Sequence, residues 1–226
     1  MATFRLALIS MPWPLANRPS IQLGTLKAFI TTKGAEVKTD CHHLYLEVGN
    51  LLGLKTYNDI AERTWAAESV YAYLLNPGKR PEIEDLVGKE YGSRRRGPTP
   101  DLKTISSKIN RLHKDRHLSL DWSSYDLIGF SICLAQLTSS LYMIKHIRRN
   151  HPACSIAVGG SSCAGELGYS LLANVPEIDF VLSGEGELPL INLIKRIKKG
   201  GLKGHDSDGL FWRDEEGQIS GGGLKQ

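Results

Sequence analysis

Apolar positions form short continuous runs that alternate with segments of three-four spacing, the pattern of buried strands separated by amphipathic helices. Strands are predicted over Phe4–Ile9, Ala35–Thr39, Asp126–Ile132, Ser155–Val158 and Asp179–Leu182. Helices are predicted over Ile21–Thr32, Leu137–Asn150, Cys163–Ala173 and Leu188–Lys199. This alternation indicates an α/β fold of parallel strands joined by right-handed crossovers. We predict a Rossmann-like (flavodoxin-like), doubly wound sheet of five parallel strands in the order 2-1-3-4-5.

The stretch between the second and third strands predicts a helical insertion over residues 41–121. Its predicted helices are His42–Leu54, Asp59–Leu75 and Asp101–His117. Glycine, proline and basic residues fill Asn76–Pro100, which we predict to be disordered. Such a long insertion is uncommon in a compact α/β unit. We therefore interpret it as a helical cap or as an elaboration that faces a partner.

At the other end of the chain, Gly209–Ile219 has the alternation and the turn residues of a β-hairpin. The chain therefore divides into a Rossmann-like domain, residues 1–204, and a segment, residues 205–226. We expect that segment to hold the hairpin and the start of a linker to a further domain, because its last residues are rich in glycine.

Charge and cysteine content limit the classes of function. The 28 basic and 24 acidic residues leave a net charge of +4, which is too small a surplus to indicate nucleic acid as a partner. The four cysteines form no C-x-x-C pair and no three-cysteine run for an iron–sulfur cluster, and neither a metal site nor a catalytic residue is predicted. Scattered cysteines without a signal peptide favour the cytoplasm, and the first apolar run is too short to span a membrane.

Two smaller features have ordinary explanations. His42 and His43 resemble a metal pair but lack partners at ligand spacing, so we interpret them as loop residues. Cys163 is predicted at the start of a helix, where the pKa of a thiol can be lowered, but the sequence places no base beside it.

Small or hydroxylated residues gather at the predicted carboxyl ends of the strands, which lie on one edge of a parallel sheet. The five segments there are Ser10–Trp13, Asp40–His43, Ser131–Gln136, Gly159–Cys163 and Ser183–Glu187. Such residues let backbone amides approach a ligand closely. A dinucleotide site needs glycines after the first strand, where this chain has Met-Pro-Trp-Pro. A ligand site is therefore predicted at this edge, and NAD is disfavoured.

These segments resemble a known family. Ser131 and the Gly159-Gly160 pair resemble the Ser-x-Leu and Gly-Gly motifs of cobalamin-binding domains. Residues 183–187, Ser-Gly-Glu-Gly-Glu, resemble the signature of the cobalamin-binding half of B12-dependent radical S-adenosylmethionine enzymes. Further matches resemble the radical enzymes that mature ribosomally made peptides: Ser10-Met11-Pro12-Trp13, Arg18-Pro19-Ser20, Leu23-Gly24 and Gly165-Glu166-Leu167-Gly168. The resemblance covers residues 4–40 and 126–219.

The resemblance implies cobalamin as cofactor and a set of contacts to it. Ser131, Gly159, Gly160 and Ser161 would receive the nucleotide tail. Gly184, Glu185 and Gly186 would meet the tail or the corrin amides, and Met11 and Trp13 would pack on the corrin rim. The Asp-x-His-x-x-Gly motif, whose histidine ligates cobalt, is absent, and Cys133 replaces the leucine of Ser-x-Leu. Cobalamin would then bind base-off with no histidine ligand from the protein, and Leu134 or Gln136 would lie below the ring.

The function implied is that of the cobalamin-binding domain of a B12-dependent radical enzyme, a methyltransferase in peptide maturation. S-adenosylmethionine and the [4Fe-4S] cluster would require a radical domain in the same or another chain, which would also meet the peptide substrate. Two alternatives stay open. One is a non-catalytic module that binds another small ligand or a protein. The other is a nucleotide-dependent enzyme of flavodoxin-like topology.

Overall fold

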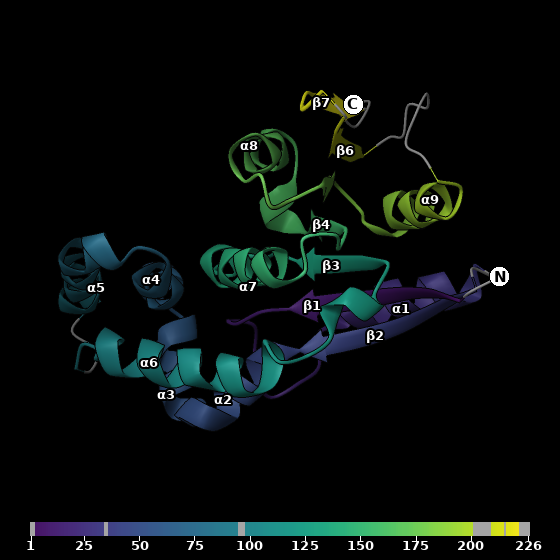
Figure 1. Cartoon of the computed structure of the whole chain (residues 1–226). Helices are drawn as coiled ribbons and strands as arrows, with labels where there is room; N and C mark the ends of the chain where they lie inside the picture. Colours follow the sequence, from purple (N-terminus) through teal and green to yellow (C-terminus); the bar gives the residue numbers. More distant parts are fainter. Residues whose placement is uncertain (1–2, 34–35, 95–97, 201–208, 215, 222–226) are drawn as a thin grey trace.

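The computed structural model describes residues 3–33, 36–94, 98–200, 209–214 and 216–221. Across these residues the chain forms one mixed sheet in the order β2-β1-β3-β4-β5-β6-β7 (Figure 1). The strands are β1 Phe4–Ser10, β2 Val37–His43, β3 Leu127–Ser131, β4 Ile156–Gly159, β5 Phe180–Leu182, β6 Leu210–Arg213 and β7 Ile219–Gly221. The predicted α/β class is confirmed.

The five predicted parallel strands pair in the predicted order, but the sheet does not end with them. The predicted hairpin exists, and its first strand, β6, pairs antiparallel with β5, so the described sheet has seven strands and is mixed. The local sequence pattern predicted the hairpin itself. The pairing of β6 with β5 depends on the direction that the chain takes after its last helix, which the local pattern does not determine. Residues 201–208 and 222–226 lie outside the described part, so the division at residue 204 and the linker stay predictions.

Helices cover both faces of the sheet. They are α1 Ile21–Thr32, α7 Leu137–Asn150, α8 Glu166–Asn174 and α9 Glu187–Lys198. Because side chains alternate along a strand, Leu6 and Leu8 of β1 face α1 and α9, while Ala7 and Ile9 face α7 and α8. Two apolar cores result, one on each side of the sheet. The boundaries of α1 and α7 match their predictions, and α8 begins later than predicted because Ser161–Cys163 forms a short 3-10 helix.

Strand β2 is longer than predicted. Its last four residues pair with the second half of β1, with Asp40 opposite Ala7 and His43 opposite Ser10. His42 Nε2 lies 3.3 Å from the Tyr125 hydroxyl, and the Ser20 amide donates to His43 Nδ1 at 3.3 Å. The two histidines are therefore strand residues with structural partners and not loop residues. Burial lowers the pKa of both.

The insertion is helical, as predicted. Its helices are α2 Leu44–Leu52, α3 Leu54–Ala61, α4 Thr64–Leu75, α5 Arg80–Arg94 and α6 Leu102–Leu112, followed by the π-helical turn η2, His113–His117. The disorder predicted for Asn76–Pro100 is wrong for residues 76–94, and residues 95–97 lie outside the described part. Helix α5 is stabilised by tertiary contacts: Val87 is fully buried, and the Tyr91 hydroxyl donates to Asp59 at 2.7 Å.

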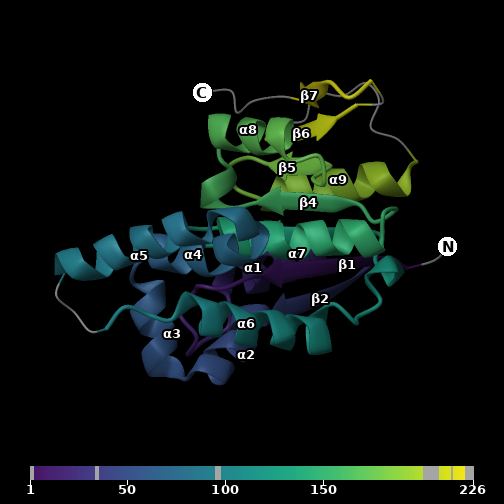
Figure 2. The same cartoon turned by 60° about the vertical axis from the view of Figure 1, so that its left-hand side comes forward.

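The insertion packs on the end of β1 and shares a core with the sheet (Figures 1 and 2). Tyr45 and Tyr57 donate hydrogen bonds of 2.7 Å to the carbonyls of Arg18 and Pro14, in the segment that follows β1. Trp13 donates from its indole nitrogen to the Ala67 carbonyl at 2.8 Å. These contacts place the insertion over the carboxyl end of β1.

Glu68 of α4 caps the amino end of α7. Its carboxylate accepts from the amides of Leu137 and Thr138 at 3.0 and 2.8 Å and from the Thr138 hydroxyl at 2.6 Å. Gln136, at the N-cap, makes no capping bond of its own. We expect Glu68→Ala to lower the free energy of unfolding by about 1–2 kcal/mol, because it leaves orphan amides and removes an anion from the positive end of the helix. Urea titration followed by circular dichroism measures this loss. Glu36→Ala, which removes an exposed carboxylate just before β2 and outside any helix, is the control, and equal effects would contradict the capping role.

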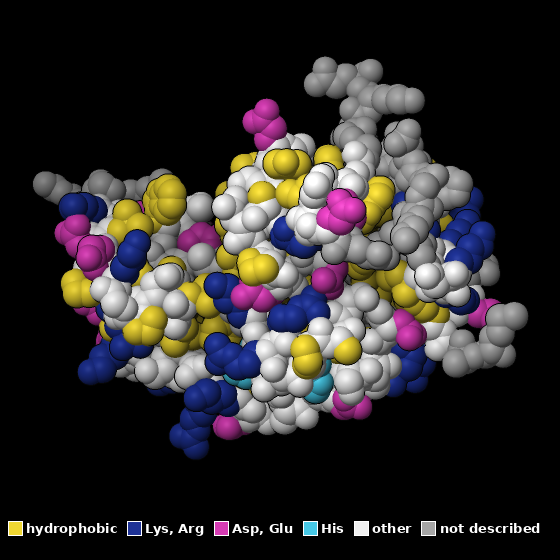
Figure 3. Space-filling view, turned by 45° about the horizontal axis from the view of Figure 1, so that its top comes forward, with side chains coloured by type: hydrophobic (Ala, Val, Ile, Leu, Met, Phe, Trp, Pro, Cys, Tyr) yellow, Lys and Arg dark blue, Asp and Glu magenta, His cyan; other side chains and the backbone are white. Residues whose placement is uncertain are grey.

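The described surface carries mixed charge. On the face shown in Figure 3, Lys and Arg side chains lie in several separate groups with acidic side chains among them. No helix within the described ranges is both long enough and apolar enough to cross a membrane.

Candidate ligand-binding site at the carboxyl ends of the strands

A cavity of about 390 Å³ opens at the predicted edge of the sheet. It lies between the ends of β1, β3, β4 and β5 and the two helices α1 and α9. Its walls are apolar and come from both layers: the buried Leu8, Gly129 and Ala157 from the sheet, the buried Leu23 and half-buried Leu26 from α1, and the buried Leu190 from α9. A volume of this size is in the range of small-molecule sites, about 300–1,000 Å³.

Two small residues in neighbouring strands make room for this cavity. Gly129 of β3 pairs with Ala157 of β4, so both positions that could fill the space carry little or no side chain. A Cβ at Gly129 would lie 3.1 Å from Leu8 Cδ2, a contact that shows how close the wall is. The space between the sheet and the helices therefore exists because glycine and alanine occupy positions at which strand centres usually carry β-branched side chains.

The mouth of the cavity is formed by the turns after β4 and β5. Gly160 has φ +108° and Gly184 has φ +85°, backbone conformations that favour glycine. Gly186 has an ordinary φ of −75° and is the N-cap of α9. The charged side chains that line the cavity are those of Glu185 and Glu187, and its lining, all within the described residues, includes no Lys or Arg.

The structure brings together six of the eleven residues predicted to bind the cofactor. They are Ser131, Gly159, Gly160, Gly184, Glu185 and Gly186, all lining the cavity. Ser161 lies on the exposed turn after them and is not part of the lining. The cavity side of α1 was not predicted. Among the residues of α1, Gln22, Thr25 and Leu26 line the cavity. That α1 lies against β3 and β4 as well as β1 is seen only in the tertiary structure.

Met11 and Trp13 lie elsewhere, in the core of the insertion. Met11 is fully buried, and the Trp13 ring packs on Tyr57 and Tyr71 at centroid distances of 5.0 and 6.3 Å. Neither side chain is available at the cavity mouth, so the expectation that they pack on a ligand's rim is corrected. The sequence could not show this, because the aromatic partners come from the insertion.

The two residues predicted to lie below a ring differ in accessibility. Gln136 is buried and holds the turns after β1 and β3 together, donating to Ser10 Oγ at 3.3 Å and to the Met11 carbonyl, and accepting from the Cys133 amide at 3.0 Å. Leu134, at the tip of the same turn, is 73% exposed. Of the two, Leu134 offers a free side chain above the edge of the sheet.

Cys163 does not have an activated thiol. It is fully buried, and burial, with a smaller contribution from Cys133, raises the pKa of its thiol to about 12. The lowering of the pKa that a position at a helix start can produce therefore does not occur, because the thiol is buried in the core.

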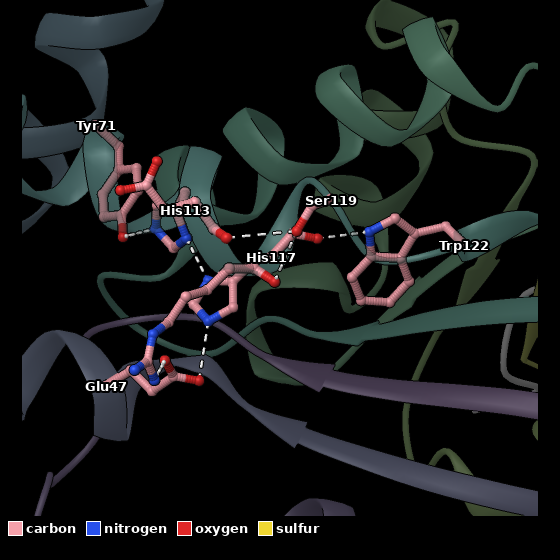
Figure 4. Close-up of polar contacts among 8 residues, drawn as sticks. Glu47, Tyr71, His113, His117, Ser119 and Trp122 are labelled. Atoms are coloured by element: carbon pink, nitrogen blue, oxygen red, sulfur yellow. Dashed lines mark hydrogen bonds and ion pairs between the residues drawn. The ribbon is translucent and has the colours of Figure 1, made fainter.

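A buried polar chain in the insertion was not predicted from sequence. The Tyr71 hydroxyl lies 2.8 Å from His113 Nε2, His113 Nδ1 lies 2.7 Å from His117 Nδ1, and His117 Nε2 lies 3.0 Å from Glu47 Oε1 (Figure 4). An ionised carboxylate can only accept, so His117 donates to Glu47. In the arrangement in which both rings are neutral, His113 donates to His117 and Tyr71 donates to His113. Burial raises the pKa of Glu47, but hydrogen bonds from His117 and Arg116 outweigh the effect of burial and lower that pKa overall.

No group of three or more His, Cys, Asp or Glu side chains within the described part of the chain could hold a metal ion.

Comparison with known proteins gives a fold. No protein-family model matches the sequence, and no curated protein matches it. A solved structure of the cobalamin-dependent S-adenosylmethionine radical enzyme OxsB, with aqua-cobalamin and S-adenosylmethionine bound, aligns with a TM-score of 0.52 at 16% identity, over 98% of this chain and 22% of that chain. A second OxsB structure, with aqua-cobalamin bound, aligns with a TM-score of 0.49 at 17% identity, over the same shares.

The chain has the fold of part of OxsB. At 16% identity the likeness concerns the path of the backbone, and the chain spans about a fifth of the length of the enzyme that it matches. The expected fold is therefore supported from two directions, by the strand order of the chain itself and by this alignment.

Proposed function

We propose that this chain is a cobalamin-binding domain and that the cavity at the ends of β3, β4 and β5 receives the nucleotide tail of the cofactor. The observation that carries the proposal is the cavity itself: an apolar space of about 390 Å³ whose mouth consists of the glycine turns that resemble cobalamin motifs. The OxsB fold adds support, since the OxsB structure that aligns with a TM-score of 0.52 was solved with aqua-cobalamin bound.

The chemistry of the lining fits this cofactor better than a nucleotide. A mononucleotide or dinucleotide cofactor presents a terminal phosphate or a pyrophosphate that requires cations or free amides, whereas the single phosphodiester of the cobalamin tail carries one charge and would stay at the open mouth. The cavity presents Glu185 and Glu187 and no basic side chain among its described lining, which disfavours the flavodoxin-like nucleotide enzyme. A flat, largely apolar base can enter between Leu23, Ala157 and Leu190 and gain about 25 cal/mol for each Å² of apolar surface removed from water.

The residues of the chain take definite roles in this proposal. Ser131, Gly159 and Gly160 would hold the tail where it enters, and Gly184, Glu185 and Gly186 would contact it or the corrin amides. Ser161 would lie beside that entry. Leu134 would lie below the ring and offers no ligand atom, which agrees with base-off binding without a protein histidine. When bound, cobalamin supplies a cobalt centre that can carry a methyl group.

The catalytic context is also part of the proposal. These 226 residues contain no C-x-x-x-C-x-x-C run, so S-adenosylmethionine and the [4Fe-4S] cluster would belong to a radical domain in the same or another chain. The resemblance at residues 10–24 and 165–168 favours methylation of a peptide as the reaction. The peptide would meet the cofactor on the open side of the sheet edge.

Cobalamin binding is the direct test. The purified chain is mixed with hydroxocobalamin, passed through gel filtration, and its visible spectrum recorded and titrated. We expect a coloured complex that co-elutes with the protein, and weaker binding of cobinamide, which lacks the nucleotide tail. A colourless protein would overturn the proposal and leave a non-catalytic module that binds another ligand or a protein.

Gly186→Leu tests the cavity without straining the backbone. Its φ is ordinary, and a Cβ there lies 3.5 Å from Leu26 Cδ2, so the added side chain projects into the mouth. We expect cobalamin affinity to fall at least about tenfold, or about 1.4 kcal/mol. Gly24→Leu adds the same side chain to the exposed face of α1, with no atom within 4 Å of its Cβ, and should bind as the unmodified chain does. Equal affinities in the two variants would place the ligand elsewhere.

A further inference from the structure

The buried interior of the cavity offers no side chain that can form a hydrogen bond. The polar side chains that line it all keep contact with solvent at its mouth: Gln22, Thr25, Ser131, Glu185 and Glu187. The buried wall residues are Leu8, Leu23, Ala157, Leu182 and Leu190. The backbone groups of β3 and β4 pair within the sheet. A ring that enters this interior therefore meets apolar atoms alone.

From this chemistry, and resting on the proposed cobalamin function, we infer that the cavity selects corrinoids by the base of their nucleotide tail. It takes a benzimidazole with apolar edges and discriminates against a purine. A purine such as adenine carries an amino group and ring nitrogens that form hydrogen bonds with water. Inside this cavity they lose water and gain no partner, and each unpaired group weakens binding.

Size does not explain the same selection. Both bases are flat fused bicyclic rings, so a cavity of about 390 Å³ admits either. The two methyl groups of dimethylbenzimidazole are apolar, and their burial against the walls favours binding. The polarity of the walls therefore distinguishes a benzimidazole from a purine. At Ala157 this polarity can be changed with little change in the volume of the cavity.

The test compares cobalamin with an adenine-tailed cobamide of the same upper ligand, each titrated into the purified chain and followed by visible absorption. We expect the adenine-tailed form to bind about 10- to 100-fold more weakly. Ala157→Ser places a hydroxyl on the cavity floor and should narrow this ratio. Ala7→Ser makes the same change at a fully buried position on the opposite face of the sheet and should leave the ratio unchanged.

The outcomes separate the inference from the function on which it rests. Equal affinity for both corrinoids overturns the selection and leaves cobalamin binding intact, whereas no affinity for either overturns the proposed function. Leu26→Gln, on the helical wall, is a second way to add a partner in case Ala157→Ser does not fold, as judged by circular dichroism. If the variants fold and neither reduces the ratio of the two affinities, the selection between the two bases does not arise from the cavity walls.

Discussion

Gly160→Ala is expected to lower the free energy of unfolding by about 3 kcal/mol or more, because the added Cβ would collide with backbone that cannot move. It would lie 2.6 Å from the carbonyl oxygen of Ile132 and 3.1 Å from the carbonyl carbon of that residue. The Ile132 amide donates to Gly159 at 2.7 Å, and the Ile132 carbonyl accepts from Ser162 at 3.1 Å. A shift of the backbone that relieves the collision would break these two hydrogen bonds of Ile132, which join the turns after β3 and β4.

Backbone conformation adds to this loss, and a second glycine separates the two contributions. Gly160 has φ +108°, and Gly165 has φ +55° with no atom within 4 Å of a Cβ built on it. Gly165→Ala therefore suffers conformational strain alone, about 1–3 kcal/mol. Urea titration of both variants measures the difference, and equal losses would contradict the collision. Gly160 is thus the wrong position for testing ligand binding, for which Gly186 is suited.

Lowering the pH from 8 to 5 is expected to destabilise the fold by about 2 kcal/mol through His113. This ring is fully buried, and burial, followed by the nearby His117 and His146, lowers its pKa to about 3. Tyr71 and Tyr142 also pack against it. In the unfolded chain the same ring takes up a proton near pH 6.5, so its contribution to stability is complete above that pH and is lost as pH falls toward 3.

Unfolding by urea at pH 8, 6 and 5 measures this loss. His113→Gln is neutral at every pH used, so its stability should depend less on pH, although it is lower at pH 8. The range stops at pH 5, above the usual pKa of Glu47, so that carboxylates contribute little. His151→Gln, in the turn before β4, is the control for removing a histidine. The same pH dependence in the unmodified chain and in His113→Gln would show that this ring does not titrate with unfolding.

Much of the fold follows from local pattern. Continuous apolar runs predicted the five parallel strands, and these strands pair in the order predicted for a flavodoxin-like doubly wound sheet. The same pattern failed for α5, whose sequence has little amphipathic character. That helix depends on the burial of Val87 and on Tyr91, which bonds a residue 32 positions away.

The candidate site divides in the same way. Gly159, Gly160, Gly184 and Gly186 were predicted, because glycine turns after parallel strands must share one edge of the sheet. Met11 and Trp13 come from the same edge but pack into the insertion. Chain neighbours do not determine which way a side chain at a strand end turns, since that depends on the surface packed against it.

By itself, the sequence of this protein determined its strands, most of its helices and the edge where its glycine turns meet. Only the tertiary structure decided which space stays open at that edge, that α1 closes one side of it, and that Tyr71 and His113 meet across 42 positions of the chain. The physical reason is range. Periodicity and turn propensity act between residues a few positions apart, whereas a cavity or a buried hydrogen bond exists only where remote segments pack together.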